Sequence, residues 1–216
     1  GVGFVNNGTV QVNAGTLAYG ASNVIATGAV TVDGATAILA LGNNQSDTVS
    51  TVTVANGGSI TGTGTSSLTS TATYEMQDGS VSAILAGAGI ALNKTTGGTA
   101  TLRGVNTFTG VTTINAGVLS VGTIGNGGVA GNLGQATAVA GNLVLGGGTL
   151  QYTGGIASTD RVITLTPFTT SGIDVTASNL TLTSAIPAST GALTKSGAGT
   201  LTLPVPNFYT GTTTVN

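Results

Sequence analysis

The sequence predicts an all-β protein in the form of a parallel β-helix, a solenoid of about 8–9 coils of roughly 20–25 residues with almost no helix. Three observations lead to this fold class. Short segments alternate apolar and polar residues, glycines recur at a similar spacing, and a segment from the middle of the chain returns at its end. We expect one continuous solenoid over residues 1–216, because no linker or shift in composition divides the chain.

The composition indicates an ordered and nearly neutral β protein. Charged residues make up 5% of the 216 residues, apolar residues make up 40%, and 37 positions are glycine. A typical domain has about 25% charged residues. Disorder normally requires high charge and few β-branched residues, so a weakly charged chain rich in Val, Ile, Leu and Thr favours a folded structure.

Short strands are expected along the whole chain. Each has apolar residues at alternate positions with Thr or another polar residue between them, as in a strand half-buried against a narrow interior. The clearest are Val10–Val12, Val30–Val32, Thr51–Val54, Leu143–Leu145, Leu180–Leu182 and Leu201–Leu203. No window shows the apolar spacing of a helix, so we expect practically no helix.

Glycine marks the expected corners of the coils. The series comprises Gly15, Gly34, Gly58, Gly79, Gly98, Gly117, Gly148, Gly172 and Gly199. Its mean interval, roughly 23 residues, suits a coil of three short strands, and we expect glycine to supply positive φ at each corner. The longest interval, between Gly117 and Gly148, contains Gly122–Gly128, which we interpret as a loop protruding from the solenoid.

The repeated segment is the most informative motif. Positions 92–115 align without a gap with positions 193–216, and half of the aligned positions are identical. The first copy contributes Leu92, Lys94, Gly98, Leu102, Asn106, Phe108, Gly110, Asn115 and Gly117. The second contributes Leu193, Lys195, Gly197, Gly199, Leu201, Leu203, Asn207, Tyr209, Gly211 and Asn216. Because a repeated unit stacks on its neighbours, we assign these residues a structural role.

These two segments resemble the autotransporter-associated β-strand repeat, whose pattern combines a Leu-x-Lys start, glycine corners, a Leu-x-Leu strand and an Asn-x-aromatic-x-Gly turn. The resemblance covers about a quarter of the chain. It implies a right-handed parallel β-helix in a large bacterial protein that is secreted or anchored in the outer membrane. It also implies an extracellular location and no catalytic residues.

The residue types exclude much enzyme chemistry. The chain has no histidine and no cysteine, which removes Ser-His triads, Cys nucleophiles and zinc sites built on those ligands, and we expect no cofactor or metal. Only two acids lie close in sequence, Glu75 and Asp78. They could form a glycosidase pair or a calcium site, but we favour a turn aspartate beside an exposed strand glutamate. We interpret Asp160-Arg161 as a surface corner rather than a ligand clamp, and Lys94 and Lys195 as structural residues.

The distribution of charge excludes two classes of partner. The four basic residues are spread over a hundred positions, so no cationic patch for nucleic acid or anionic membranes is expected. No apolar run reaches the ~20 residues needed to cross a bilayer, so we expect no membrane insertion in this segment. Four glycosylation triplets begin at Asn7, Asn44, Asn93 and Asn179, a pattern that arises by chance in chains rich in Asn and Thr.

Three functions are compatible with these features. We favour a non-catalytic segment of a bacterial surface or secreted protein with a stalk, adhesin or matrix role, whose host or matrix ligand (glycan or protein) stays unspecified. A second hypothesis is the subunit of an extracellular filament, and a third is a polysaccharide-processing β-helix. Both ends of the sequence are expected to continue, so the open terminal coils would stack on more of the same chain or on another copy.

Overall fold

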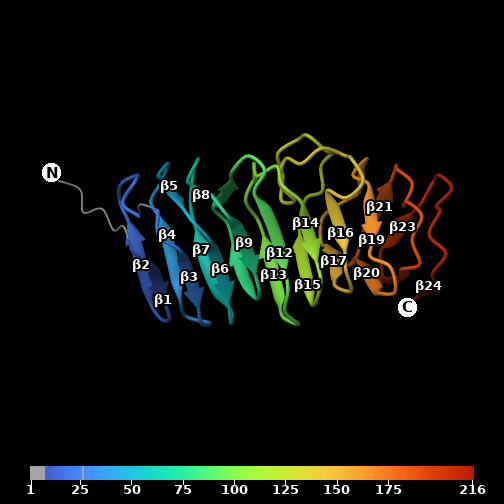
Figure 1. Ribbon diagram of the computed structural model, residues 1–216, viewed down its shortest axis with the longest axis horizontal. Helices are drawn as coiled ribbons and strands as arrows, with labels where there is room; N and C mark the ends of the chain where they lie inside the picture. Colours follow the sequence, from blue (N-terminus) through green and yellow to red (C-terminus); the bar gives the residue numbers. More distant parts are fainter. Residues whose placement is uncertain (1–7, 26) are drawn as a thin grey trace.

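The computed structural model describes residues 8–25 and 27–216, which form a stack of β-coils (Figure 1). These residues contain 24 strands and no helix. They therefore include no helix long and apolar enough to cross a membrane. The first strands and the last strand of the described chain lie at opposite ends of the stack, as expected for a chain that winds steadily along one axis.

The coil has three sides, two of which are long sheets. The eight-stranded sheet consists of β1 (Val10–Val12), β3 (Val30–Asp33), β6 (Val52–Ala55), β9 (Thr73–Met76), β12 (Ala91–Lys94), β14 (Thr112–Ile114), β16 (Leu143–Leu145) and β19 (Ile163–Leu165). The ten-stranded sheet consists of β2 (Thr16–Tyr19), β4 (Ile38–Leu41), β7 (Gly58–Thr61), β10 (Gly79–Val81), β13 (Thr99–Leu102), β15 (Val118–Val121), β17 (Thr149–Tyr152), β20 (Thr170–Val175), β22 (Ala192–Ser196) and β24 (Thr213–Val215).

The third side is interrupted. It consists of one three-stranded sheet, β5 (Ser46–Val49), β8 (Ser67–Ser70) and β11 (Ile84–Ala86), and a second one, β18 (Ala157–Thr159), β21 (Asn179–Leu182) and β23 (Thr200–Thr202). Between them lies a long loop, residues 122–142, that Figure 1 shows rising above the sheets near β14 and β16. The predicted protruding loop is thus present, and it is longer than its glycine-rich start.

All pairings between the strands are parallel and in register from one coil to the next. Ile38 pairs with Ser59, and Gly79 pairs with Ala100 at the same sequence offset. The offset is much larger between Val118 and Thr149, because the long loop is inserted there. The predicted all-β solenoid is therefore confirmed, and sequential strands fall in different sheets because each coil visits one side after another.

The predicted number of coils was too low, since the ten-stranded sheet has ten levels rather than 8–9. Near the end of the chain, the predicted series of corner glycines moves from one corner of the coil to another. Gly199 precedes β23 on the third side, whereas β22 of the ten-stranded sheet follows Gly191. Counting glycines therefore missed the last level.

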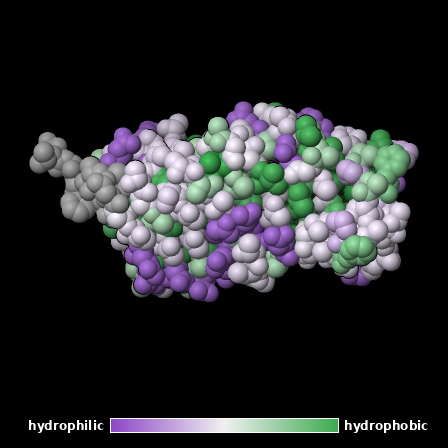
Figure 2. All heavy atoms as spheres, viewed as in Figure 1, coloured by the Kyte–Doolittle hydropathy of each residue, from purple (hydrophilic) through white to green (hydrophobic). Residues whose placement is uncertain are grey.

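The interior is a narrow column of stacked apolar side chains. Alternate residues are buried in most strands, as in β3 and β9, and equivalent positions of successive coils lie on top of one another. Tyr74 and Phe108 are two of its aromatic members, with ring centroids 5.8 Å apart. The Tyr74 hydroxyl donates to the carbonyl oxygen of Leu68 at 2.7 Å, and burial raises the pKa of this phenol. The outer surface is mostly of intermediate hydropathy on the face that Figure 2 shows.

The predicted positive φ at every corner glycine is only partly correct. Gly15, Gly34, Gly79 and Gly117 have it, whereas Gly58, Gly98, Gly148, Gly172 and Gly199 do not. At Gly58 the preceding Gly57 adopts φ 86° instead, and a Cβ on Gly58 would overlap the carbonyl oxygen of Val32 in the preceding coil. Here the coils approach too closely for a side chain, so the requirement is one of space rather than of backbone conformation.

The interpretation of Asp160-Arg161 as a surface corner is wrong for Arg161, which is buried. Its guanidinium donates to carbonyl oxygens of the long loop, at 3.0 Å to Gly125, 2.8 Å to Gly134 and 3.2 Å to Ala136. Burial lowers the pKa of Arg161, partly offset by Asp160. Arg161 therefore holds the loop against the solenoid through contacts between residues that are distant in sequence.

We predict that Gly58→Ala destabilises the protein by about 2 kcal/mol, because the new methyl group forces two coils apart. Gly97→Ala is the matched control: the same substitution, at a corner two coils further on, meets open space. Chemical unfolding followed by circular dichroism measures both variants. Equal stabilities of the two variants would show that the coils do not approach as closely as described.

Candidate functional site

The two copies of the repeat are built from the same contacts. In each copy the strand that contains the lysine pairs with the closing strand, β12 with β14 and β22 with β24. The amide of Asn115 donates to Lys94 O at 2.8 Å, and the amide of Asn216 donates to Lys195 O at 2.9 Å. The repeat is therefore a structural unit of one coil plus the strand that closes it.

Asn106 and Asn207 cap the preceding coil with their side chains. The Oδ1 atom of Asn106 accepts from Leu85 N at 2.8 Å, and Oδ1 of Asn207 accepts from Ile186 N at 2.8 Å. These amides would otherwise be buried without an acceptor, which is unfavourable. The spacing that the two copies share thus places an amide side chain where a neighbouring strand is missing.

Two further residues act as caps, and no sequence pattern marked either of them. Asp47 Oδ1 accepts from the amides of Val24 at 2.7 Å and Ile25 at 2.9 Å. Asn132, in the long loop, accepts from Gly122 N at 3.0 Å and Thr123 N at 2.8 Å. Neither belongs to the repeated segment, so only the folded coil reveals the common role.

The two lysines of the repeat turn inward. Both are buried, and each ammonium group donates to backbone carbonyl oxygens of the next corner: Lys94 to Thr96, and Lys195 to Ser196 at 2.6 Å and Gly197 at 2.7 Å. Desolvation lowers the pKa of Lys94, and the nearby Asp78 partly offsets this effect. These lysines hold a corner together and are not available to a ligand.

The remaining repeat residues fill the interior or form corners. Leu92, Leu102, Phe108 and Leu193 are buried, whereas Leu201, Leu203 and Tyr209 are half-buried against the core. At Gly110 and Gly211 a Cβ would overlap the backbone of the preceding coil, and Gly98 and Gly199 are similarly crowded. Gly117 and Gly197 adopt positive φ.

The two copies face different sides of the solenoid. The strand with Lys94 lies in the eight-stranded sheet, but the strand with Lys195 lies in the ten-stranded sheet. The following strands are displaced in the same sense, since β13 is in the ten-stranded sheet and β23 is on the third side. The separation of the two copies therefore corresponds to four coils and one further side, not to a whole number of coils.

The acids do not assemble into a catalytic or metal centre in the described ranges. Glu75 accepts from Asn93 Nδ2 at 2.7 Å, and Asp78 lies at the corner beside Gly98. No group of three potential metal ligands occurs among residues 8–25 and 27–216. Of the glycosylation triplets, Asn44 and Asn179 are exposed, Asn93 is half-buried, and Asn7 lies outside the described residues.

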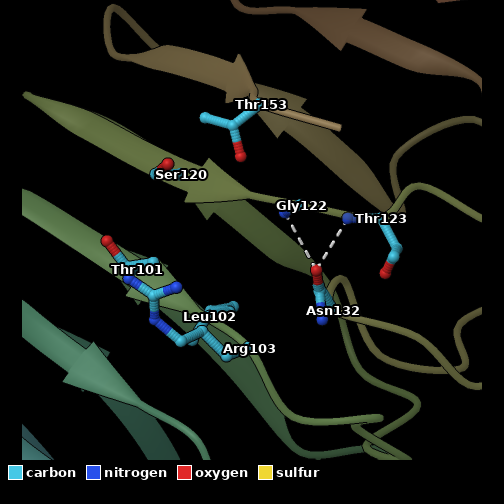
Figure 3. Close-up of a pocket in the computed structure, with 8 residues that line it drawn as sticks. All are labelled: Thr101, Leu102, Arg103, Ser120, Gly122, Thr123, Asn132 and Thr153. Carbon is cyan, nitrogen blue, oxygen red and sulfur yellow. Dashed lines mark hydrogen bonds between the residues drawn. The ribbon is translucent and has the colours of Figure 1, made fainter. Parts of the chain in front are cut away.

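A groove of about 370 Å³ lies where the ten-stranded sheet meets the long loop (Figure 3). It is lined by Thr101, Leu102, Arg103, Ser120, Gly122, Thr123, Asn132 and Thr153. Asn132 also donates from Nδ2 to Gly104 O at 2.9 Å, so its amide fastens the loop to two successive coils. The repeat builds the scaffold, whereas this groove is a concave polar surface on it.

We predict that Asp47→Asn raises stability at pH 7 by about 1 kcal/mol, the scale for an uncompensated buried polar atom, and has little effect at pH 3. Asp47 is buried, and its Oδ2 has no hydrogen-bond partner. Desolvation raises the pKa of Asp47 above its ordinary value of 3.8 despite the two amides that lower it, and the carboxylate in turn contributes to a raised pKa of Tyr19. The folded state therefore disfavours ionisation of the Asp47 carboxyl group. The free energy of unfolding falls as the pH rises above the pKa that Asp47 has in the unfolded chain.

Urea unfolding of both proteins at the two pH values measures this difference. Asp33→Asn, at a partly exposed carboxylate that accepts from Asn56 at 2.7 Å, is the control. A gain for Asp47→Asn that is the same at pH 3 and pH 7 would contradict the proposed cause.

Comparison with known proteins agrees with this architecture. The passenger-associated-transport-repeat family matches residues 92–121 and 193–216, the two repeat copies. The chain is also 38% identical over 177 residues to the adhesin BmaC autotransporter of Brucella suis biovar 1 (strain 1330). This alignment covers 74% of the chain and 5% of the relative, so the chain spans a small part of that protein's length. No solved structure matches. The resemblance found in the sequence is therefore confirmed: the chain carries two copies of the passenger-associated-transport repeat.

Proposed function

We propose that the chain is a non-catalytic structural segment of a bacterial secreted or cell-surface protein, part of a passenger solenoid with a stalk or adhesive role. The observation that supports this most is the use of the repeat residues. The caps, the lysines and the glycines of both copies bind or contact the protein's own backbone. The residues that the two copies share therefore serve to build the coils.

The dimensions suit a spacer. Ten levels of strands separated by about 4.8 Å give a stack roughly 43 Å long in only 216 residues. Each coil is bonded to the coils above and below it, so length can be added without a larger core. Such a stack projects whatever it is attached to away from its point of anchorage.

The chemistry of the surface supports a non-catalytic role. Glu75 and Arg161 form hydrogen bonds within the protein, and Asp47 is buried. A polysaccharide-cleaving site needs two carboxyl groups about 5–10 Å apart across an open cleft. The groove beside the long loop has no carboxylate in its lining. The similarity to an autotransporter adhesin supports a secreted or cell-surface location.

We predict that an epitope inserted between Ala88 and Gly89, in the native gene context, is stained by antibody on intact cells. This corner is exposed, and Gly89 has open space around its Cα, so the insertion leaves the coils in place. An epitope on a cytoplasmic protein is the control for cell integrity. Staining that requires permeabilised cells would contradict the proposed location.

A further inference from the structure

The four basic residues of the chain differ in what they contact. Lys94, Lys195 and Arg161 are buried and donate to backbone carbonyl oxygens. Arg103 is exposed, and its guanidinium forms no hydrogen bond or ion pair within residues 8–25 and 27–216, although its amide donates to Val81 O at 2.8 Å. One cation is therefore left for a partner outside the described chain.

This cation lies in the groove beside the long loop. Arg103 follows β13, and Figure 3 shows its side chain extending back along the strand toward Thr101. Thr123 and Thr153 approach the same space from two other segments. The hydroxyls of Thr101 and Thr123 form no hydrogen bond with the described residues, whereas Ser120 donates to Gln151 at 2.8 Å and Thr153 donates to Val121 O at 3.3 Å. The lining thus combines one positive charge with free hydroxyls and no carboxylate.

The groove is formed before any ligand arrives. Asn132 fastens its floor through bonds to Gly122, Thr123 and Gly104, and Arg161 holds the loop behind it. A preformed site avoids the entropic cost of ordering a loop on binding. Its volume, about 370 Å³, is at the small end of the range of about 300–1,000 Å³ for small-molecule sites.

We propose that this groove binds an acidic saccharide through the carboxylate of a hexuronic acid unit. A guanidinium matches a carboxylate with two parallel hydrogen bonds, which an ammonium group does not. The free hydroxyls of Thr101 and Thr123 suit the hydroxyls of a sugar ring. A peptide ligand would need an apolar pocket for a side chain, and the only large apolar residue of the lining is the buried Leu102. The proposal does not depend on the structural role above.

Titration of the ¹⁵N-labelled 216-residue chain, followed by NMR, tests the proposal. The probes are D-glucuronic acid, D-glucose and acetate. We expect D-glucuronic acid to shift the amide signals of Arg103, Gly122 and Thr123 and to bind at least tenfold more tightly than either of the other probes. D-Glucose has the sugar ring but no carboxylate, so it measures recognition of the ring alone. Acetate has the carboxylate but no ring, so it measures recognition of the charge alone.

Variants of the cation complete the test. Arg103→Gln should weaken glucuronate binding at least tenfold, and Arg103→Lys should weaken it less. Gln11→Glu, at an exposed residue of β1, changes the net charge by the same amount and should leave binding unchanged. The Arg103 side chain makes no bond to residues 8–25 or 27–216, so its replacement should leave the fold intact. An amide spectrum that is unchanged outside the groove shows that the variants are folded. Equal binding of acetate and glucuronate, or undiminished binding by Arg103→Gln, would overturn the proposal.

Discussion

Parallel backbone hydrogen bonding between successive coils, in register, is the constraint on which the rest of the structure depends. It holds stacked residues about 4.8 Å apart, so like charges in adjacent coils would repel each other. The outward row formed by Thr31, Thr53, Glu75, Asn93 and Thr113 illustrates the result. Its single charge, Glu75, lies beside Asn93, which donates to it at 2.7 Å. Stacking in register therefore favours a low charge along this row.

The same constraint explains the buried amide side chains. Where a coil has no strand on one of its sides, the backbone beside the gap would lose its hydrogen-bond partners. Asn106, Asn132 and Asn207 replace them with side-chain oxygens, and Asp47 does so near the beginning of the described chain. Asp47 differs from the three asparagines because it can carry a charge. One oxygen of its carboxylate has no hydrogen-bond partner. The caps let the interior continue through an irregular side.

Local patterns predicted the coils but not the relation between distant parts. Alternation in Val30–Val32 or Leu143–Leu145 depends on neighbouring residues, so those strands were placed correctly. The displacement of the second repeat by one side depends on the summed length of the intervening coils, which is uneven because one of them carries the long loop. The burial of Arg161 depends on the same loop, which is distant in sequence. The groove at Arg103 likewise joins β13 to residues of β15 and the long loop, and no local motif marks it.

The most direct test of the stacked register is a distance along the outer row. Thr31 and Thr164 lie in the same row of the eight-stranded sheet, six strand spacings apart. The chain has no native cysteine, so spin labels on Thr31→Cys and Thr164→Cys are specific. Double electron–electron resonance should give one narrow distribution of the distance between the two labels. We expect it near about 29 Å, which is six spacings of about 4.8 Å. A broad distribution, or a narrow one far from this distance, would contradict the stacked-coil account.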